Sequence, residues 1–343
     1  MVWTCLCRLQ SGWRNAANRP SRSCYRHNSL PAAVREVDAC FGGIDIDVVD
    51  IATAKRKMPL LDCRSMFVPV ITSREISMHI DDVCHSITPV IGQPGLFQAE
   101  VDDGWAQGRT LFGGIQALLA VRAMRAAMPD LPPLWSLHTT FVAPAAAGQL
   151  GLRVELLRQG RAAVQVAARL MAGEQVAAMF VAVFGASRDS ALSFKPEVKP
   201  LATDSSAGPE LPFIAGMSPE FTRHYAYRWV EGGLPFSGHY ATTNRILLRQ
   251  RDPGLMGEEQ IVAMADAIPP VALSLVQGHA PASTISWELE FVHHGEPIGN
   301  EGWWRMDASL VAARDGYANQ DAHLYGPDGE LIALSRQVVA VFA

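Results

Sequence analysis

The sequence predicts an α+β fold of two tandem units, each with an antiparallel sheet wrapped around its own helix. A helical run that begins near residue 113 is followed by four strand-like runs with short turns, and the same order recurs after residue 258. The last strands of the two series, AAMFVAVFG and SRQVVAVFA, are almost identical. A pattern repeated in this way indicates a duplicated fold.

The first unit is expected over residues 78–190. Its helix is predicted in TLFGGIQALLAVRAMRAAM, where apolar residues recur at helical spacing after Gly113 and Gly114. The strand-like runs that follow are LWSLHTTFVAP, GQLGLRVELLRQG, AAVQVAARLMAG and EQVAAMFVAVFG. Glycine and proline residues mark the turns between them, which predicts an antiparallel meander.

The second unit is expected over residues 219–343. Its helix is predicted in EEQIVAMADAIPPVALSLV, and its strands in ASTISWELEFVHH, GWWRMDASLVAARDG, YANQDAHLYGPDG and ELIALSRQVVAVFA. Residues 191–218 contain FKPEVKPLATDSSAGPELP, which is rich in proline, serine and charge. This composition predicts a linker between the units.

Residues 1–77 lack this periodicity and are expected to lie outside both units. Residues 1–30 contain five arginines and no acid, a composition that fits an organellar transit peptide. The simpler explanation, which we favour, is a disordered extension or a translation start at Met66 or Met78, and a small ordered extension is the third alternative. We therefore expect a cytoplasmic protein, or an organellar one if residues 1–30 form a transit peptide.

The composition bounds the partners. The chain has 343 residues, of which 49% are hydrophobic and 18% charged, and its net charge is −5. This charge gives no overall attraction to nucleic acid, and no apolar run reaches the roughly 18 residues of a membrane-spanning helix. The six cysteines lie in the first quarter without the spacing of a zinc site or a disulfide framework. We expect no metal and no cofactor.

Asp266 is the first candidate for a functional residue. It is the single ionisable residue of the run IVAMADAIPPVALSL, and a buried carboxylate without a partner costs several kcal/mol or takes up a proton. It therefore serves chemistry or supports the chain break at Pro269 and Pro270. Aligning IQALLA with IVAMAD places Asp266 opposite Ala120 of the first repeat, which predicts one working site per chain.

Several segments together resemble the acyl-CoA thioesterases of the double hotdog type. In the first half they are LFGG, SLHTTFVAP, LLRQGRAAVQVAARL and FVAVFG, and in the second half ADAIPPVAL, STISWELEFV and GELIALSRQ. The resemblance covers residues 90–343 and implies a double hotdog fold. It also implies hydrolysis of acyl-CoA thioesters by an Asp, a Thr and a Gln, which in this chain are Asp266, Thr284 and Gln337. After Thr284 the chain carries Ser286 and Trp287 where well-known members have an Asp-His pair.

The resemblance assigns roles to these residues. Asp266 would activate a water, as base or as nucleophile, while Thr284 and Gln337 orient it. The N–H groups of Gly113 and Gly114 would bind the thioester carbonyl or an anionic group of the substrate, unless these glycines serve only close packing. Acyl-CoA is the expected partner, and a homo-oligomer is expected because hotdog sheets commonly continue across subunits.

Two other functions remain open at this point. The first is a non-catalytic module that binds acyl-CoA, and the second is a hotdog hydratase or dehydratase that acts on acyl thioesters. The second usually pairs a carboxylate with a histidine, and no histidine lies near Asp266 or Thr284 in the repeat. A serine hydrolase of the α/β type is unsupported, because the chain has no G-x-S-x-G motif.

Overall fold

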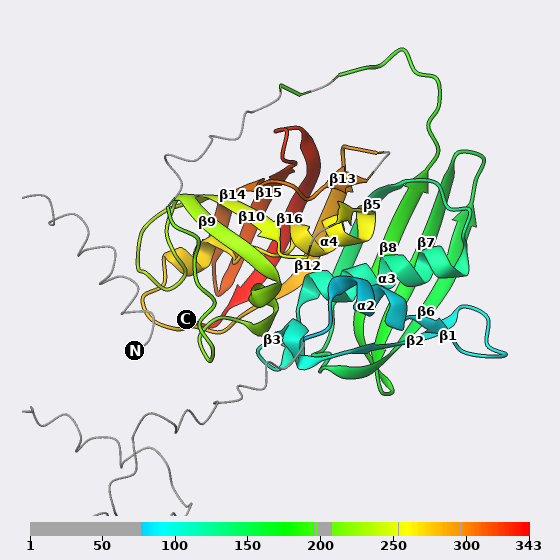
Figure 1. The fold of residues 1–343 in the computed structure, drawn as a ribbon, viewed down its shortest axis with the longest axis horizontal. Helices are drawn as coiled ribbons and strands as arrows, with labels where there is room; N and C mark the ends of the chain where they lie inside the picture. The colour runs from blue at the N-terminus through cyan, green and yellow to red at the C-terminus, as the bar shows by residue number, and fades with distance from the viewer. Residues whose placement is uncertain (1–76, 195, 198–207, 253, 295–296) are drawn as a thin grey trace, which may run out of the picture. The chain divides into compact units, whose positions relative to one another are not determined.

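The computed structural model describes residues 77–194, 196–197, 208–252, 254–294 and 297–343 (Figure 1). All of these residues belong to one structural unit. The extension expected over residues 1–77 lies outside the described residues except for Ser77, as do five of the six cysteines. The remaining cysteine, Cys84, is a buried free thiol.

The first half begins with a short helix, and its four longest strands follow the central helix. Its elements are α2 (Ile80–Ser86), β1 (Thr88–Pro89), β2 (Leu96–Val101), the 3₁₀-helix η3 (Asp103–Trp105), β3 (Ala106–Gln107), β4 (Thr110–Leu111), α3 (Gly113–Ala127), β5 (Leu134–Phe141), β6 (Gly148–Gln159), β7 (Ala163–Ala172) and β8 (Gln175–Gly185).

The second half repeats this order. Its elements are the 3₁₀-helix η4 (Glu220–His224), β9 (Tyr225–Glu231), β10 (Thr243–Gln250), β11 (Leu255–Met256), α4 (Glu258–Ala265), the 3₁₀-helix η5 (Val271–Ser274), β12 (Ala282–Phe291), β13 (Ile298–Gly299), β14 (Trp304–Arg314), β15 (Tyr317–Tyr325) and β16 (Leu331–Val341).

One twelve-stranded sheet joins the two halves. Its order is β1-β2-β6-β7-β8-β5-β12-β16-β15-β14-β10-β9, so the second half mirrors the first about the β5–β12 junction. At this junction Leu137 pairs with Leu289 in an antiparallel ladder. The mirrored order places β16 where β8 lies in the first half. The predicted α+β double hotdog is confirmed, with the refinement that the two sheets form one.

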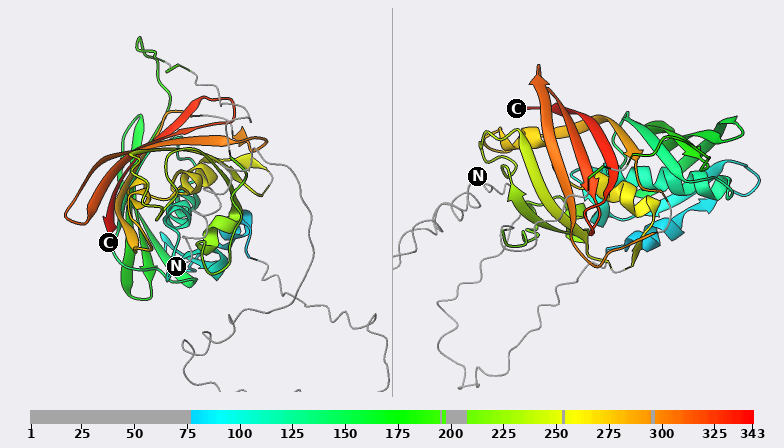
Figure 2. Two further views of the ribbon diagram at one scale, coloured as in Figure 1. Left: turned by 90° about the vertical axis from the view of Figure 1, so that its left-hand side faces the viewer. Right: turned by 90° about the horizontal axis from the view of Figure 1, so that it is seen from above.

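The sheet wraps around the central helices. In Figure 2 the strands curve around α3 and α4, and every residue from Gly114 to Val121 of α3 is buried. A helix on the surface would show one apolar stripe, whereas α3 is enclosed by β6, β7, β8, α4 and α2. The inward residues of the strands, such as Val166, Phe180 and Leu324, complete the core.

The helix expected over residues 258–276 is shorter than predicted. It ends at Ala265, and a separate 3₁₀ turn, η5, follows Pro270. A proline lacks the N–H that a helix needs, and its ring disfavours helical geometry at the preceding residue. The prolines therefore end α4 early and leave Asp266 at its C-terminal cap.

Contacts between the halves extend beyond the sheet. The carbonyl of Ala263 in α4 lies where a Cβ on Gly114 of α3 would project, so the two helices pack at the distance that glycine allows. The rings of Phe112 and Phe221 stack at 4.0 Å between centroids. Among the described helices, none is long and apolar enough to cross a bilayer.

Candidate active site

Asp266 occupies the irregular backbone between α4 and η5. Its φ of −103° and ψ of 0° fall in the sparsely populated bridge region, where many active-site residues lie. The side chain is half-buried, whereas its neighbours Ala265 and Ala267 are fully buried. The chain break therefore aims one carboxylate at the α3–α4 interface.

Two groups from different halves hold the carboxylate. The Nε2 atom of Gln337 donates a hydrogen bond of 2.6 Å to Oδ1 of Asp266, and the backbone N–H of Gly114 also donates to the carboxylate. A Cβ on Gly113 would lie 2.6 Å from Oδ2. Both glycines predicted from the sequence thus lie beside Asp266, and the N–H of Gly114 is directed at the carboxylate.

Burial raises the pKa of Asp266 from 3.8 to about 7, because the interior disfavours the charged form. The hydrogen bonds from Gln337 and Gly114 favour the carboxylate and oppose this rise. A carboxyl group with this pKa accepts and releases a proton near neutral pH, as a general base requires. The chemistry expected of Asp266 is therefore compatible with its surroundings.

Thr284 lies on the same inner face of the sheet as Gln337. It pairs with Val339 of β16, two residues beyond Gln337, and a bulge follows it before Ser286. Paired residues share a face, and both Val339 and Gln337 are buried. Within the described residues the Thr284 hydroxyl has no hydrogen-bond partner. Its contact with Asp266 or with a bound water stays a prediction.

Gln320 is a site residue that the sequence analysis missed. It pairs with Gln337 across the β15–β16 ladder and is buried at 3% exposure. Its Nε2 donates to Oε1 of Gln337 at 2.8 Å, and its Oε1 accepts from the N–H of Val271 at 2.9 Å. No sequence motif marks Gln320, because the contact depends on the pairing register of two strands.

Strand β9 contributes two further residues near Asp266. The hydroxyl of Tyr227 donates to the carbonyl of Ala267 at 2.9 Å and fixes the residue after Asp266. The Tyr225 hydroxyl is buried without a hydrogen-bond partner among the described residues. Burial raises the pKa of Tyr225, and the negative charge of Asp266 raises it further. The alternation YAYRW predicts a strand but not its proximity to Asp266.

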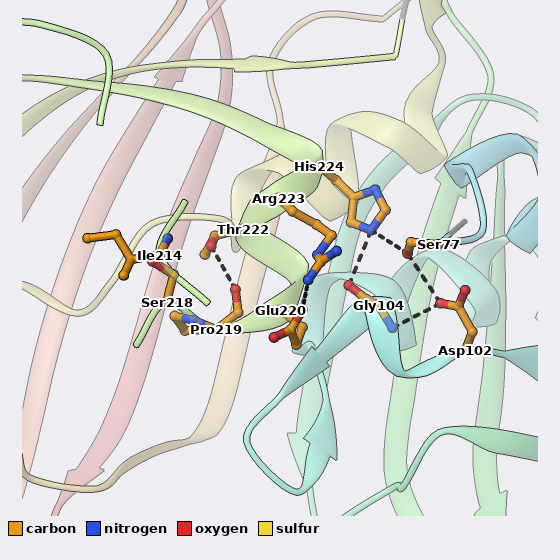
Figure 3. A network of polar contacts seen from close by, with 10 residues as sticks. All are labelled: Ser77, Asp102, Gly104, Ile214, Ser218, Pro219, Glu220, Thr222, Arg223 and His224. Atoms are coloured by element: carbon orange, nitrogen blue, oxygen red, sulfur yellow. Dashed lines mark hydrogen bonds and ion pairs between the residues drawn. The ribbon is translucent and has the colours of Figure 1, made fainter. Parts of the chain in front are cut away.

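A serine, a histidine and an aspartate meet at a second polar cluster (Figure 3). The Nε2 atom of His224 lies 3.1 Å from Oγ of Ser77 and 3.2 Å from the carbonyl of Gly104. Asp102 contacts Ser77 rather than the second imidazole nitrogen, so the order of a catalytic triad is absent from this cluster. The His224 ring stacks on the Trp105 ring with 3.8 Å between the ring centroids. This contact joins η4 to η3.

Two adjacent histidines, His293 and His294, follow β12 and have separate partners. His293 lies 3.6 Å from a carboxylate oxygen of Glu330, whereas His294 stacks against Trp135. His138 faces Glu288 across the β5–β12 junction at 3.5 Å. Each of these histidines therefore has a local contact within the fold.

Two family models match the sequence. The acyl-CoA thioesterase N-terminal domain matches residues 101–185, and the acyl-CoA thioesterase C-terminal domain matches residues 201–341. Together the two domains span most of the chain and include Gly113, Asp266 and Gln337. No curated protein matches the sequence.

Solved structures share the fold. A hot dog fold protein of unknown function from Alicyclobacillus acidocaldarius superposes with a TM-score of 0.68 at 21% identity, covering 78% of this chain and 99% of its own. A putative thioesterase II from Thermobifida fusca gives 0.62 at 17% identity, covering 78% and 99%. An acyl-CoA thioesterase II from Mycobacterium marinum gives 0.58 at 17% identity, covering 77% and 99%. With both thioesterase domains present in order on a double hotdog fold, the chain belongs to the acyl-CoA thioesterase family.

Proposed function

We propose that this protein hydrolyses acyl-CoA thioesters to a free acid and CoA, with Asp266 as the base that activates water. The observation that carries the proposal is the position of Asp266. Its carboxylate is held between the Gln337 amide and the Gly114 N–H, and burial brings its pKa to about 7. The family supports thioester hydrolysis in general, and the geometry supports this residue as its centre.

In the proposed reaction Asp266 removes a proton from a water as the water oxygen bonds to the thioester carbonyl carbon. The C–S bond then breaks, and the protonated Asp266 returns the proton to the departing CoA thiolate. Gln337 and the Thr284 hydroxyl orient the water, since neither side chain titrates in this range. The Gly113 N–H, at the start of α3, has no intrahelical acceptor, so it is suited to the carbonyl oxygen as it gains charge, whereas the Gly114 N–H already donates to Asp266.

The test is a thiol-release assay with acyl-CoAs of different chain lengths. Asp266→Asn keeps the shape of the side chain but removes its basicity, and general-base assistance is worth about 10²- to 10⁴-fold in rate. We expect turnover to fall at least about a hundredfold while acyl-CoA binding persists. Asp130→Asn, at an exposed turn after α3, is the matched control and should keep full activity.

The companion variants test whether the residues act as one unit. Gln337→Ala and Thr284→Ala should each lower turnover. In combination with Asp266→Asn, each should lower turnover by a smaller factor than it does alone. Near-full activity in Asp266→Asn would show that the aspartate only supports the chain break. In that case the catalytic assignment is wrong.

The two rival functions give different results in the same assay. A binding module would bind acyl-CoA without releasing thiol. A hydratase or dehydratase would change the acyl group without releasing thiol. That chemistry usually pairs a carboxylate with a histidine, but among the described residues Asp266 is hydrogen-bonded to the Gln337 amide and the Gly114 N–H. Thiol release that depends on Asp266 therefore separates the three functions.

A further inference from the structure

We propose that Gln320 is a positioning residue for the reaction, because it fixes the direction in which the Gln337 amide faces Asp266. The inference rests on the proposed function for its role in catalysis. Its structural part concerns four groups in a row, namely the Val271 N–H, Gln320, Gln337 and Asp266. They are joined by consecutive hydrogen bonds of 2.9, 2.8 and 2.6 Å.

The groups at the two ends of this row determine which atoms donate and which accept along it. A backbone N–H only donates, so Gln320 must turn its Oε1 to Val271 and its Nε2 to Gln337. Gln337 must then accept at Oε1 and present its NH₂ group to Asp266. The carboxylate at the other end only accepts, which agrees with this order. Without Gln320, the Gln337 amide could rotate and present its oxygen to the carboxylate.

The row also spans the segment that contains the two prolines. Val271 follows Pro270 as the first residue of η5, and an N–H at a helix start has no intrahelical acceptor. Gln320 satisfies this N–H while Gln337 holds Asp266, five residues earlier. Two paired residues of the sheet therefore fasten both ends of the segment 266–271. Because Gln320 is only 3% exposed, water does not compete for its hydrogen bonds.

The test compares Gln320→Met with a matched control. Methionine has a similar length but cannot donate a hydrogen bond. Ser335→Ala removes a different buried hydrogen bond on the same face of β16, the 2.9 Å bond from the Trp287 indole N–H. Both variants should lose stability, but only Gln320→Met should lower kcat, by about tenfold, with little change in KM, because a misplaced orienting group costs rate rather than binding.

The second readout is the titration of Asp266, which needs no turnover. The carboxyl band in the infrared difference spectrum is assigned by its loss in Asp266→Asn. Gln320→Met should move its midpoint upward by about 0.5 or more, because the hydrogen bond that favours the carboxylate weakens. Ser335→Ala should leave it unchanged. If wild type releases no thiol but this shift is found, the positioning stands and the proposed function fails.

A measurement on the wild-type protein covers the case in which Gln320→Met does not fold. The side-chain amide signals of Gln320 in NMR should titrate with Asp266 although the two side chains are not in contact, while the Trp287 indole signal should not. Gln320 signals that stay constant through the Asp266 titration would overturn the proposal. So would equal losses of kcat in Gln320→Met and Ser335→Ala without a shift of the infrared midpoint.

Discussion

Asp266 lowers the stability of the fold at neutral pH. Well below pH 3.8 the carboxyl is protonated in both states and costs little. Between pH 4 and 7 the unfolded chain releases the proton first, because its pKa lies near 3.8 while the folded value is about 7. The native state then binds more protons, so the free energy of unfolding falls as pH rises. Above pH 7 the loss levels off at about 4 kcal/mol at most.

Asp266→Asn should therefore be more stable than wild type, by an amount that depends on pH. The difference in the free energy of unfolding should be small at pH 4 and grow to about 2–4 kcal/mol at pH 8. Urea unfolding at the two pH values measures it. Asp130→Asn should show no such change, and an equal difference at both pH values would refute the raised pKa.

The adjacent glycines of α3 offer a second prediction at the residue scale. A Cβ at position 113 would lie 2.6 Å from Oδ2 of Asp266, whereas one at position 114 would lie 2.5 Å from the backbone carbonyl of Ala263. Gly113→Ala should displace the carboxylate and reduce thiol release at least about tenfold. Gly114→Ala should force α3 and α4 apart and cost more stability, about 1–3 kcal/mol.

Activity and urea unfolding, measured for both variants, check this division. The reverse order, with Gly114→Ala the more stable variant and Gly113→Ala fully active, would contradict it. The comparison is internally matched, because both substitutions gain the same helix propensity of about 1 kcal/mol.

Part of the candidate site could be predicted from the sequence. The rest depends on contacts between distant segments that no sequence pattern marks. Asp266 is conspicuous because a carboxylate in an apolar run requires an explanation, and Gln337 and Thr284 follow from the family resemblance. Gln320 and Tyr225 are not conspicuous, because alternating polar residues are ordinary in strands. Their proximity to the site depends on strand register and on partners far away in the sequence, such as the Val271 N–H, which lies 49 residues from Gln320.

At the element scale, the contact between α3 and α4 depends on an ion pair as well as on glycine. Arg125, in the last turn of α3, makes a bidentate pair with Glu258 at the start of α4, at 2.5 and 2.9 Å. Each charge also lies at the helix end that favours it. Both side chains are only about one-fifth exposed, so solvent screens the pair weakly.

A double-mutant cycle with Arg125→Met and Glu258→Gln should give a coupling free energy of about 1–3 kcal/mol. The pair of Arg336 and Asp321 has similar two-pronged geometry but lies on the exposed face. Its cycle should give less than about 1 kcal/mol. Equal coupling in the two cycles would show that burial does not set the strength of the inter-helix pair.

The elements themselves were predictable where their periodicity is long. Strands β6, β7, β8, β14 and β16 lie within the predicted runs, because each alternates or is continuously apolar over many residues. The second helix was predicted too long, since its apolar pattern continues past Asp266 while the prolines interrupt the hydrogen bonding. Short elements such as β3, β4 and η3 have only two or three residues and leave no periodic signal, and β3 and η3 contact η4 of the other half.

At the scale of the whole molecule, one outer edge of the sheet is covered and the other ends in a short strand. Beyond β9, the N–H of Leu211 donates to the carbonyl of Tyr227, and at the other edge β1 has only two residues. Short or covered edges discourage pairing with another chain. The expected homo-oligomer stays a prediction, and sheet continuation at these edges would have to displace residues 208–211 or extend β1.

Both halves also contribute to the candidate site, which predicts how the protein responds to a cut between them. Asp266, Thr284 and Gln337 come from the second half, but Gly113 and Gly114, which contact the Asp266 carboxylate, come from the first. The β5–β12 ladder and the α3–α4 contact should hold the halves together without a covalent link. A protease site placed at residues 198–207 of the full chain allows the cut after folding.

The nicked protein should elute as one species, unfold in one cooperative transition and keep the proposed thioesterase activity. Its refolding after urea should become concentration-dependent, because the halves must then associate as separate chains. Uncut protein that carries the same protease site is the control. Two separate unfolding transitions would contradict a single shared core, and loss of activity without dissociation would show that the segment at 198–207 itself supports the site.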